Sequence, residues 1–283
     1  MSEHSKGLSN PVMTTIVTCP ICFHDDVFFY SLKAKSLASR QNVFSIPIYL
    51  DTPKYVYVDF NDYSFSVCPH CYFTSNRKQD FIYTDSIAGT KNKSTLLPKI
   101  IEHWTENKKE VEDLLIDNFV DENSFKEPRT DEGIISSSKL GIYKTNLEIL
   151  YKVPYSHLKR ARAYLKLFYT IRKLYKNEDE SILKKALEDL EYVFKESDFP
   201  EISYEYEVLY LISAIYMRLG DEANTTQYFK VFDKTKSEVL QKAKANPQIN
   251  THEVTHWLNR AKNLWQDRSD NMVWEVLNPW PRK

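Results

Sequence analysis

The sequence contains little glycine. Only five glycines occur among 283 residues, and no two of them lie within five positions of each other. A Walker A loop needs two glycines before its lysine, and a dinucleotide-binding fingerprint needs three in a short stretch, because the backbone must approach phosphate without an intervening Cβ. Nucleotide-dependent chemistry of these two kinds is therefore excluded.

An excess of one charge and a membrane-length apolar run are also lacking. Lys and Arg number 38 against 39 Asp and Glu, so the chain has no global basic signature for nucleic acid. No apolar run approaches the ~18 residues of a transmembrane helix, and residues 1–13 are polar, unlike a secretory signal. We therefore expect a cytoplasmic protein with no membrane insertion.

Cysteine is scarce, and all four cysteines fall into two C-x-x-C hooks. The first hook is Cys19-Pro20-Ile21-Cys22, and the second is Cys68-Pro69-His70-Cys71. Each tight turn aims two sulfurs at one point, which suits a tetrahedral Zn²⁺. The hooks predict one structural zinc ion held by Cys19, Cys22, Cys68 and Cys71. Four thiolates leave no coordination position for a water, so this zinc is not expected to be catalytic.

Other interpretations of the cysteines have less support. A redox dithiol needs a βαβ context, and neither hook lies in an alternation of strand and helix. Disulfides are disfavoured because no secretory signal precedes the hooks. His24 and His70 lie beside the cysteines and could replace one as ligand, although a supporting role around the site is the stronger expectation.

Residues 14–93 are expected to form a small β-rich zinc-ribbon domain after a disordered tail over 1–13. Segments rich in β-branched and aromatic residues predict its strands: Val27–Leu32, Val43–Leu50, Tyr55–Phe60 and Tyr63–Cys68. The turn pair Asn61-Asp62 predicts that the last two strands form a hairpin.

From Ser94 onward the apolar period becomes helical. Apolar residues between Leu96 and Phe119 predict an amphipathic helix, which belongs with the polar loop 120–137 to a connecting region, 94–137. Residues 138–283 are expected to form an all-α domain. Its predicted helices are 138–152, 155–176, 180–197, 201–219, 221–244 and 250–267. The predicted fold class is therefore α+β, with the β part first.

Two of these helices carry a repeat signature. Large, small and aromatic residues fall where a tetratricopeptide helix pair needs them: Leu209, Ile212, Ser213, Tyr216, Leu219, Gly220, Thr225, Phe229 and Phe232. A weaker copy runs from Tyr164 to Pro200, with Phe168 where a small residue is usual. The pattern favours a tetratricopeptide-like region, and an ordinary helical bundle is the alternative.

The combination of both parts resembles a known family. A C-P-x-C hook opening a β region, a strand leading into Cys68-Pro69-His70-Cys71-Tyr72, and a helical tail are similar to the bacterial domain of unknown function 2225 family, over residues 14–245. The resemblance implies the four cysteine ligands and a helical repeat tail, but no reaction. Phe23 and Tyr72 stand where a Gly typically follows such hooks, so the left-handed turns expected there would be strained.

One motif would favour an enzyme. His252-Glu253-Val254-Thr255-His256 matches the H-E-x-x-H of zinc metalloproteases, with Glu275 as a conceivable third ligand. A helix-capping interpretation is stronger, in which Asn250 is the N-cap and Glu253 returns a capping-box bond. It gives His256 no metal.

We therefore expect a non-enzymatic zinc-binding adaptor that mediates protein–protein interaction through its helical surface. A basic ridge, formed by Lys159, Arg162, Lys166, Lys173 and Lys176 with Tyr169 between them, would favour an acidic segment of a partner protein. The same ridge could instead be solvated surface. The alternatives are a zinc ribbon that binds nucleic acid, using Tyr55, Tyr57 and Tyr63, and a metallohydrolase using the His252–His256 motif.

Overall fold

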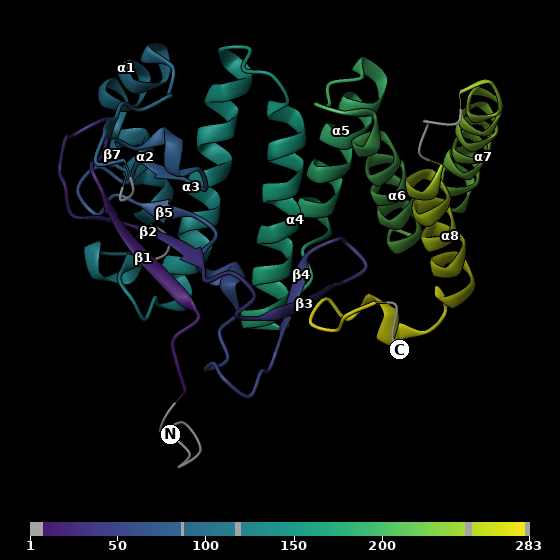
Figure 1. Cartoon of the computed structure of the whole chain (residues 1–283), viewed down its shortest axis with the longest axis horizontal. Helices are drawn as coiled ribbons and strands as arrows, with labels where there is room; N and C mark the ends of the chain where they lie inside the picture. Colours follow the sequence, from purple (N-terminus) through teal and green to yellow (C-terminus); the bar gives the residue numbers. More distant parts are fainter. Residues whose placement is uncertain (1–7, 86–87, 117–119, 247–250, 281–283) are drawn as a thin grey trace. The chain divides into compact units, whose positions relative to one another are not determined.

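The computed structural model describes residues 8–85, 88–116, 120–246 and 251–280 (Figure 1). Small antiparallel strand pairs come first and helices follow, so the predicted α+β class is confirmed. The chain divides into two compact units. Unit 1 comprises residues 1–40 and 48–153, and unit 2 comprises residues 41–47 and 154–283. These limits differ from the boundaries expected after residues 93 and 137.

The strands of unit 1 form around the two hooks. Strands β1 (Val12–Val17) and β2 (Val27–Leu32) pair antiparallel, and the first hook lies in their connection. The second hook lies between β5 (Ser66–Val67) and β6 (Thr74–Ser75). Other short pairs are β3 (Ala38–Gln41) with β4 (Pro47–Leu50), and β7 (Tyr83–Thr84) with β8 (Lys91–Asn92). The strand at 27–32 is confirmed, whereas β1 begins inside the expected tail 1–13, of which residues 1–7 lie outside the described residues.

Three strand predictions are wrong in whole or in part. Residues 55–60 form no strand, and of 63–68 only Ser66–Val67 does. The expected hairpin turn is instead the 3-10 helix η2 (Phe60–Tyr63), because the Asp59 carboxylate accepts the N–H of Asn61 at 3.1 Å. Of 43–50 only β4 is strand.

The helices of unit 1 are α1 (Pro98–Glu106), α2 (Lys108–Ile116) and α3 (Asp131–Leu150), with the 3-10 helix η4 (Glu122–Phe125) before α3. The single helix expected from Leu96 is interrupted at Asn107, which leaves helical geometry (φ −107°, ψ 36°). Phe119 lies outside the described residues. Helix α3 begins within the expected loop, because the Thr130 hydroxyl caps the N–H of Gly133 at 3.1 Å.

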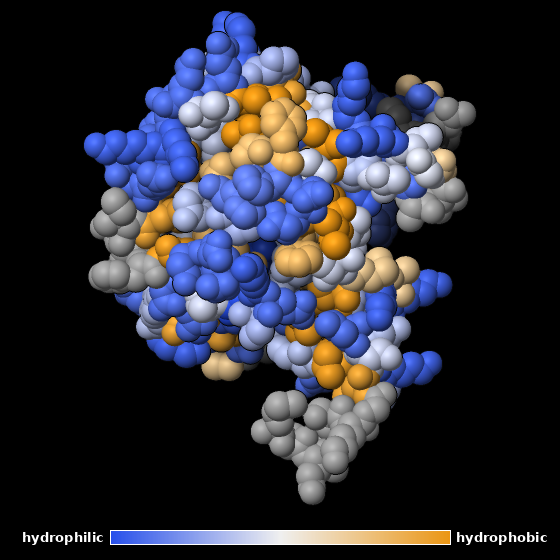
Figure 2. Space-filling view, turned by 90° about the vertical axis from the view of Figure 1, so that its left-hand side faces the viewer, coloured by the Kyte–Doolittle hydropathy of each residue, from blue (hydrophilic) through white to orange (hydrophobic). Residues whose placement is uncertain are grey.

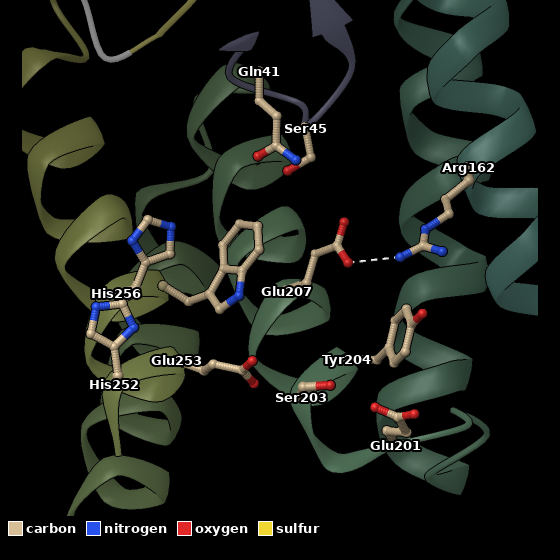
Figure 3. A pocket seen from close by; sticks show the side chains of 11 residues that line it. Gln41, Ser45, Arg162, Glu201, Ser203, Tyr204, Glu207, His252, Glu253 and His256 are labelled. Atoms are coloured by element: carbon tan, nitrogen blue, oxygen red, sulfur yellow. Dashed lines mark hydrogen bonds and ion pairs between the residues drawn. The ribbon is translucent and has the colours of Figure 1, made fainter. Parts of the chain in front are cut away.

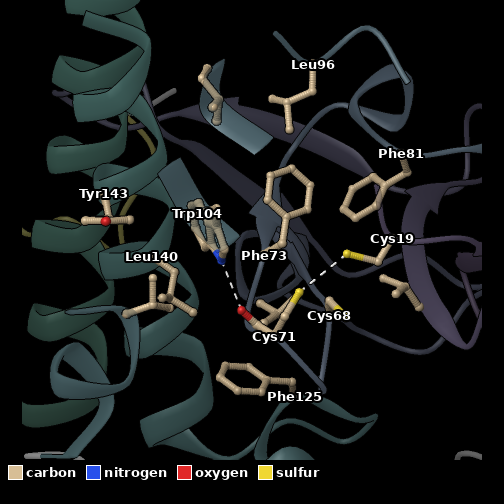
Figure 4. Packing of buried hydrophobic residues seen from close by; sticks show 14 of the residues in the cluster. Cys19, Cys68, Cys71, Phe73, Phe81, Leu96, Trp104, Phe125, Leu140 and Tyr143 are labelled. Atoms are coloured by element: carbon tan, nitrogen blue, oxygen red, sulfur yellow. Dashed lines mark hydrogen bonds between the residues drawn. The ribbon is translucent and has the colours of Figure 1, made fainter. Parts of the chain in front are cut away.

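The core of unit 1 explains why α3 belongs to it. Buried side chains of α3, among them Leu140, Tyr143 and Leu147, pack in the same cluster as the hook cysteines (Figure 4). The Lys144 amine lies in the interior as well, 2.6 Å from the Asp80 carboxylate and 2.7 Å from that of Glu148. These contacts bury the helix against the hooks, so the unit ends after α3 and not before it.

Unit 2 is helical apart from the segment 41–47 and the C-terminal stretch. Its helices follow one another side by side in Figure 1: α4 (Ser156–Tyr175), α5 (Glu180–Glu196), α6 (Ile202–Arg218), α7 (Glu222–Ala245) and α8 (His252–Asp267). The predicted ranges from 155 onward are confirmed to within two residues. Helix α6 ends at Arg218, and Gly220 follows with a left-handed φ of 74°. The N–H of Gly220 donates to the carbonyl of Met217, and the N–H of Asp221 donates to that of Tyr216.

The surface shows no single apolar area on the face drawn in Figure 2, where hydrophobic residues lie in several places between hydrophilic ones. Isolated exposed apolar side chains, such as Ile16 in β1, are ordinary on a folded protein. Within the part of the chain that the structure describes, no helix has the length and hydrophobicity needed to cross a membrane.

Candidate metal centre

The four cysteines meet at one point in unit 1. Their sulfurs all lie within 4.8 Å of one another. Sγ of Cys19 lies 3.5 Å from that of Cys71, and Sγ of Cys22 lies 3.5 Å from that of Cys68, so each close pair joins the two hooks. Sulfurs bound at ~2.3 Å to a tetrahedral metal are separated by about 3.8 Å. The predicted ligands are therefore brought together in an arrangement that can hold a metal ion.

Both hooks have the same backbone geometry. In the first, the N–H of Cys19 donates to the carbonyl of His24 and that of Phe23 donates back to Cys19. In the second, the N–H of Cys68 donates to the carbonyl of Phe73, and the N–H of Tyr72 donates to the carbonyl of Cys68. Phe23 and Tyr72 have φ values of 61° and 59°. The expected left-handed turns are thus confirmed, and each costs a side-chain-bearing residue ~1–2 kcal/mol.

His24 and His70 lie beside the sulfur cluster. Nδ1 of His24 lies 3.3 Å from Sγ of Cys22, and the N–H of Ile21 lies 3.4 Å from Sγ of Cys19. Nε2 of His70 is instead directed to the Asp26 carboxylate at 2.9 Å. Asp26 thus fixes the orientation of the His70 ring through Nε2.

Hydrogen bonding among the thiols shifts their pKa values in opposite directions. The pKa of Cys68 is lowered to about 2, because the side chains of Cys19 and Cys71 hydrogen-bond to its thiolate. The hydrogen bond with Cys68 raises the pKa of Cys19, that with Cys19 raises the pKa of Cys71, and burial adds to both rises. Binding of a metal ion by these sulfurs would require their thiols to lose protons, so metal affinity would depend on pH.

Aromatic side chains close the site on its inner side (Figure 4). The indole Nε1–H of Trp104, on α1, donates to the carbonyl of Cys71 at 3.0 Å. The Trp104 ring also packs edge-on against Phe73, with 5.3 Å between centroids. This supporting tryptophan was missed from the sequence, where it reads as one more apolar position of a helix.

The His252-Glu253-x-x-His256 motif lies on α8, in unit 2. The two imidazoles are nearly parallel, with 6.3 Å between centroids. Asn250, the expected N-cap, lies outside the described residues; α8 begins after Thr251, so Glu253 stands one position before that of a capping-box glutamate. Glu275 pairs with Arg172 at 2.9 Å. Within the described ranges, the cysteines form the one group of three or more ligands close enough to share an ion.

The basic ridge of α4 differs from its expected form at two positions. Tyr169 is buried, at 3% exposure. It therefore does not present its ring between the basic residues. The Arg162 guanidinium pairs with Glu207 of α6 at 2.7 Å, so part of the ridge charge is neutralised within the unit.

No curated protein and no solved structure matches this sequence. Residues 10–267 match the family described as "uncharacterized protein conserved in bacteria" (DUF2225), which covers both the hooks and the helices of unit 2 up to the end of α8. The chain therefore belongs to this bacterial family.

Proposed function

We propose that the protein is a non-enzymatic adaptor, in which unit 1 folds around one structural zinc ion and unit 2 binds a protein partner. The closed set of four sulfurs within 4.8 Å of one another carries the proposal. Thiolates in a tetrahedral set favour Zn²⁺, and four of them leave no open position for water or substrate. Bound zinc supplies folding free energy to the hooks. All four cysteines are free thiols, as a cytoplasmic location would keep them.

Unit 2 is the part that we assign to partner binding, as a tetratricopeptide-like array. Ser213 and Thr225 are fully buried, at the two points where helices of such a pair pack closely. Gly220 has the left-handed conformation that ends the first helix of the pair. Phe168, the departure in the weaker copy, packs its ring against that of Phe44, with 5.7 Å between centroids. A stack of helix pairs offers an extended surface to a peptide.

The alternatives have less support. A metallohydrolase needs a third ligand beside His252 and His256, and Glu275 is paired with Arg172. A nucleic-acid surface needs free aromatic rings within a basic face. Arg129 is buried and lies over the rings of Tyr30 and Tyr63, 5.0 and 5.5 Å from their centroids, so this cation serves the interior of unit 1.

Cross-linking in the native bacterium tests the adaptor proposal. The full chain would carry a photo-reactive amino acid at exposed positions of either unit, and cross-linked products would be identified by mass spectrometry. We expect a reproducible protein partner attached through unit 2, and one zinc per purified chain. Cross-links to nucleic acid alone, or no zinc in a folded chain, would contradict the proposal.

A further inference from the structure

Unit 2 encloses the chain's own segment Gln41–Pro47, which forms the turn between β3 and β4. The turn is closed by the N–H of Asn42, which donates to the carbonyl of Ile46 at 2.9 Å. Val43, Phe44 and Ile46 of this segment are almost fully buried. The Phe44 ring lies between those of Phe168 and Trp274, at centroid distances of 5.7 and 6.4 Å. The helical unit thus holds the tip of this turn together with its aromatic side chain.

Three successive carbonyls of this segment accept hydrogen bonds from unit 2. The carbonyl of Gln41 accepts from the N–H of Trp280 at 2.8 Å, that of Asn42 from Arg260 at 2.6 Å, and that of Val43 from the Tyr210 hydroxyl at 2.8 Å. The Arg260 guanidinium is itself enclosed by the Tyr210, Trp257 and Trp280 rings. These contacts hold the turn through its main chain as well as through its buried side chains.

An open pocket of about 650 Å³ adjoins the segment (Figure 3). Gln41 and Ser45 of the segment line one end of it. The remaining walls come from α4, from α6 with the residue before it, and from α8. The pocket therefore lies beside the enclosed turn.

The pocket is acidic. Glu201, Glu207 and Glu253 line it, and Arg162 is the one Lys or Arg among the described residues that do so. Arg162 is already engaged, because it pairs with Glu207 at 2.7 Å and lies over the Tyr204 ring, 5.1 Å from its centroid. Burial and the nearby Arg260 and His252 lower the pKa of His256, which keeps that imidazole neutral at neutral pH. The carboxylates thus exceed the cations.

We propose that this pocket binds a segment of a partner protein through a lysine or arginine side chain of that segment. The proposal rests on the proposed adaptor function and deepens it. The cation would lie between Glu201 and Glu253, and its alkyl stem would pack on the Trp257 ring, a combination of charge and aromatic contact that suits both basic residues. The proposed ligand is basic, whereas the ridge of α4 predicted an acidic ligand. The difference arises because carboxylates of α6 and α8 face the same pocket.

Peptide binding to the full zinc-loaded chain tests the proposal. The probes are pools of short acetylated fluorescent peptides, each with a fixed central Lys, Arg, Glu or Ala between mixed residues, and the readout is fluorescence anisotropy. We expect the Lys and Arg pools to bind more tightly than the Glu and Ala pools. The double variant Glu201→Gln/Glu253→Gln should weaken their binding about tenfold. Glu196→Gln, an exposed change on α5, is the matched control and should have no effect.

Two outcomes would overturn the pocket proposal. Equal or tighter binding of the Glu pool would give the pocket the wrong charge, and unchanged binding of the basic pools by the double variant would place their site elsewhere. A photo-reactive residue at Ser203, in the pocket, or at Tyr192, exposed on α5, separates this failure from that of the adaptor. Partner cross-links from Tyr192 but not from Ser203 would retain the adaptor and reject the pocket; links from neither position would reject both.

Discussion

The rings of His24 and His70 stack face to face, with 3.7 Å between their centroids and 16° between their planes. One follows the first hook and the other lies inside the second, so the stack joins the hooks outside the sulfur cluster. Such supporting residues typically change metal affinity by about 10–100-fold without being ligands. Variants of the cysteine ligands and variants of the stacked histidines should therefore differ in how much zinc affinity they lose.

Replacing a ligand should remove the metal. Cys68→Ser is expected to lower the zinc content from one per chain towards zero. It should also loosen the hooks of unit 1, because the free energy of zinc binding contributes to the folding of the hooks. Helices α4 to α8 should persist. Elemental analysis measures the zinc content, and hydrogen exchange measures the loosening of the hooks. The control His24→Ala should keep one zinc at reduced affinity, and a metal-free wild type with protected hooks would refute the prediction.

The two left-handed turns offer a matched pair of glycine substitutions. Phe23 is 69% exposed, so Phe23→Gly should relieve strain at little loss of packing and stabilise unit 1 by about 0.5–1 kcal/mol. Tyr72 packs near Phe125, with 6.0 Å between ring centroids, so Tyr72→Gly should gain less or destabilise. The measurement is the denaturant midpoint of unfolding of each zinc-loaded protein. If Phe23→Gly is the less stable of the two variants, the strain argument fails.

The histidines of α8 should not contribute to metal content. His256→Ala is expected to leave zinc stoichiometry unchanged, because no third ligand joins His252 and His256 among the described residues. Metal analysis of both proteins after dialysis against excess zinc is the measurement. Two zinc ions in the wild type and one in the variant would restore the metallohydrolase hypothesis.

Charge reversal on α4 separates the two partner hypotheses. If the partner segment is acidic, Arg162→Glu with Lys166→Glu should weaken its capture, with folding and zinc content intact. If the ligand is basic, losing the Arg162–Glu207 pair and adding negative charge should strengthen binding of the Lys pool. Affinity measured over a range of salt concentrations decides, because exposed charges are screened beyond ~8 Å at physiological ionic strength. Unchanged affinity for every probe would contradict both.

The buried Asp80 should make unit 1 sensitive to acid. Burial by itself would raise the pKa of Asp80, but the charge and hydrogen bonds of Lys144 and Ser75, with Arg77, hold it below its usual value. A lowered pKa in the folded state means that the stabilisation is present above pH ~4, and is lost as the pH falls through the folded pKa.

Asp80→Asn tests this dependence. The variant leaves the buried Lys144 with one carboxylate partner, Glu148, and should destabilise unit 1 by roughly 3 kcal/mol at neutral pH. Its stability should also fall less steeply in acid than that of the wild type. Hydrogen exchange of α3 at several pH values measures both effects, and parallel pH curves would show that Asp80 is not responsible.

The sequence was informative where short-range chemistry decides the structure. The hooks predicted which sulfurs meet, and the helical period from Ser156 onward predicted α4 to α8. Strands failed where one polar side chain redirects the chain, as Asp59 does ahead of η2 and Asn42 does by accepting the N–H groups of Phe44 and Ile46 at 2.9 Å. Contacts such as Trp104 with Cys71 depend on tertiary packing, for which the local pattern carries no signal.

The docked segment Gln41–Pro47 also constrains the order in which the molecule can be completed during synthesis. Tyr210, which holds the carbonyl of Val43, is made 167 residues later, and Val276, which accepts from the Asn42 amide, is made 234 residues after Asn42. At ~5–20 residues per second, the ribosome needs roughly 10 to 50 s to supply these partners. During that interval Val43, Phe44 and Ile46 have no groove to enter, and the nascent chain displays an apolar segment that a chaperone can bind.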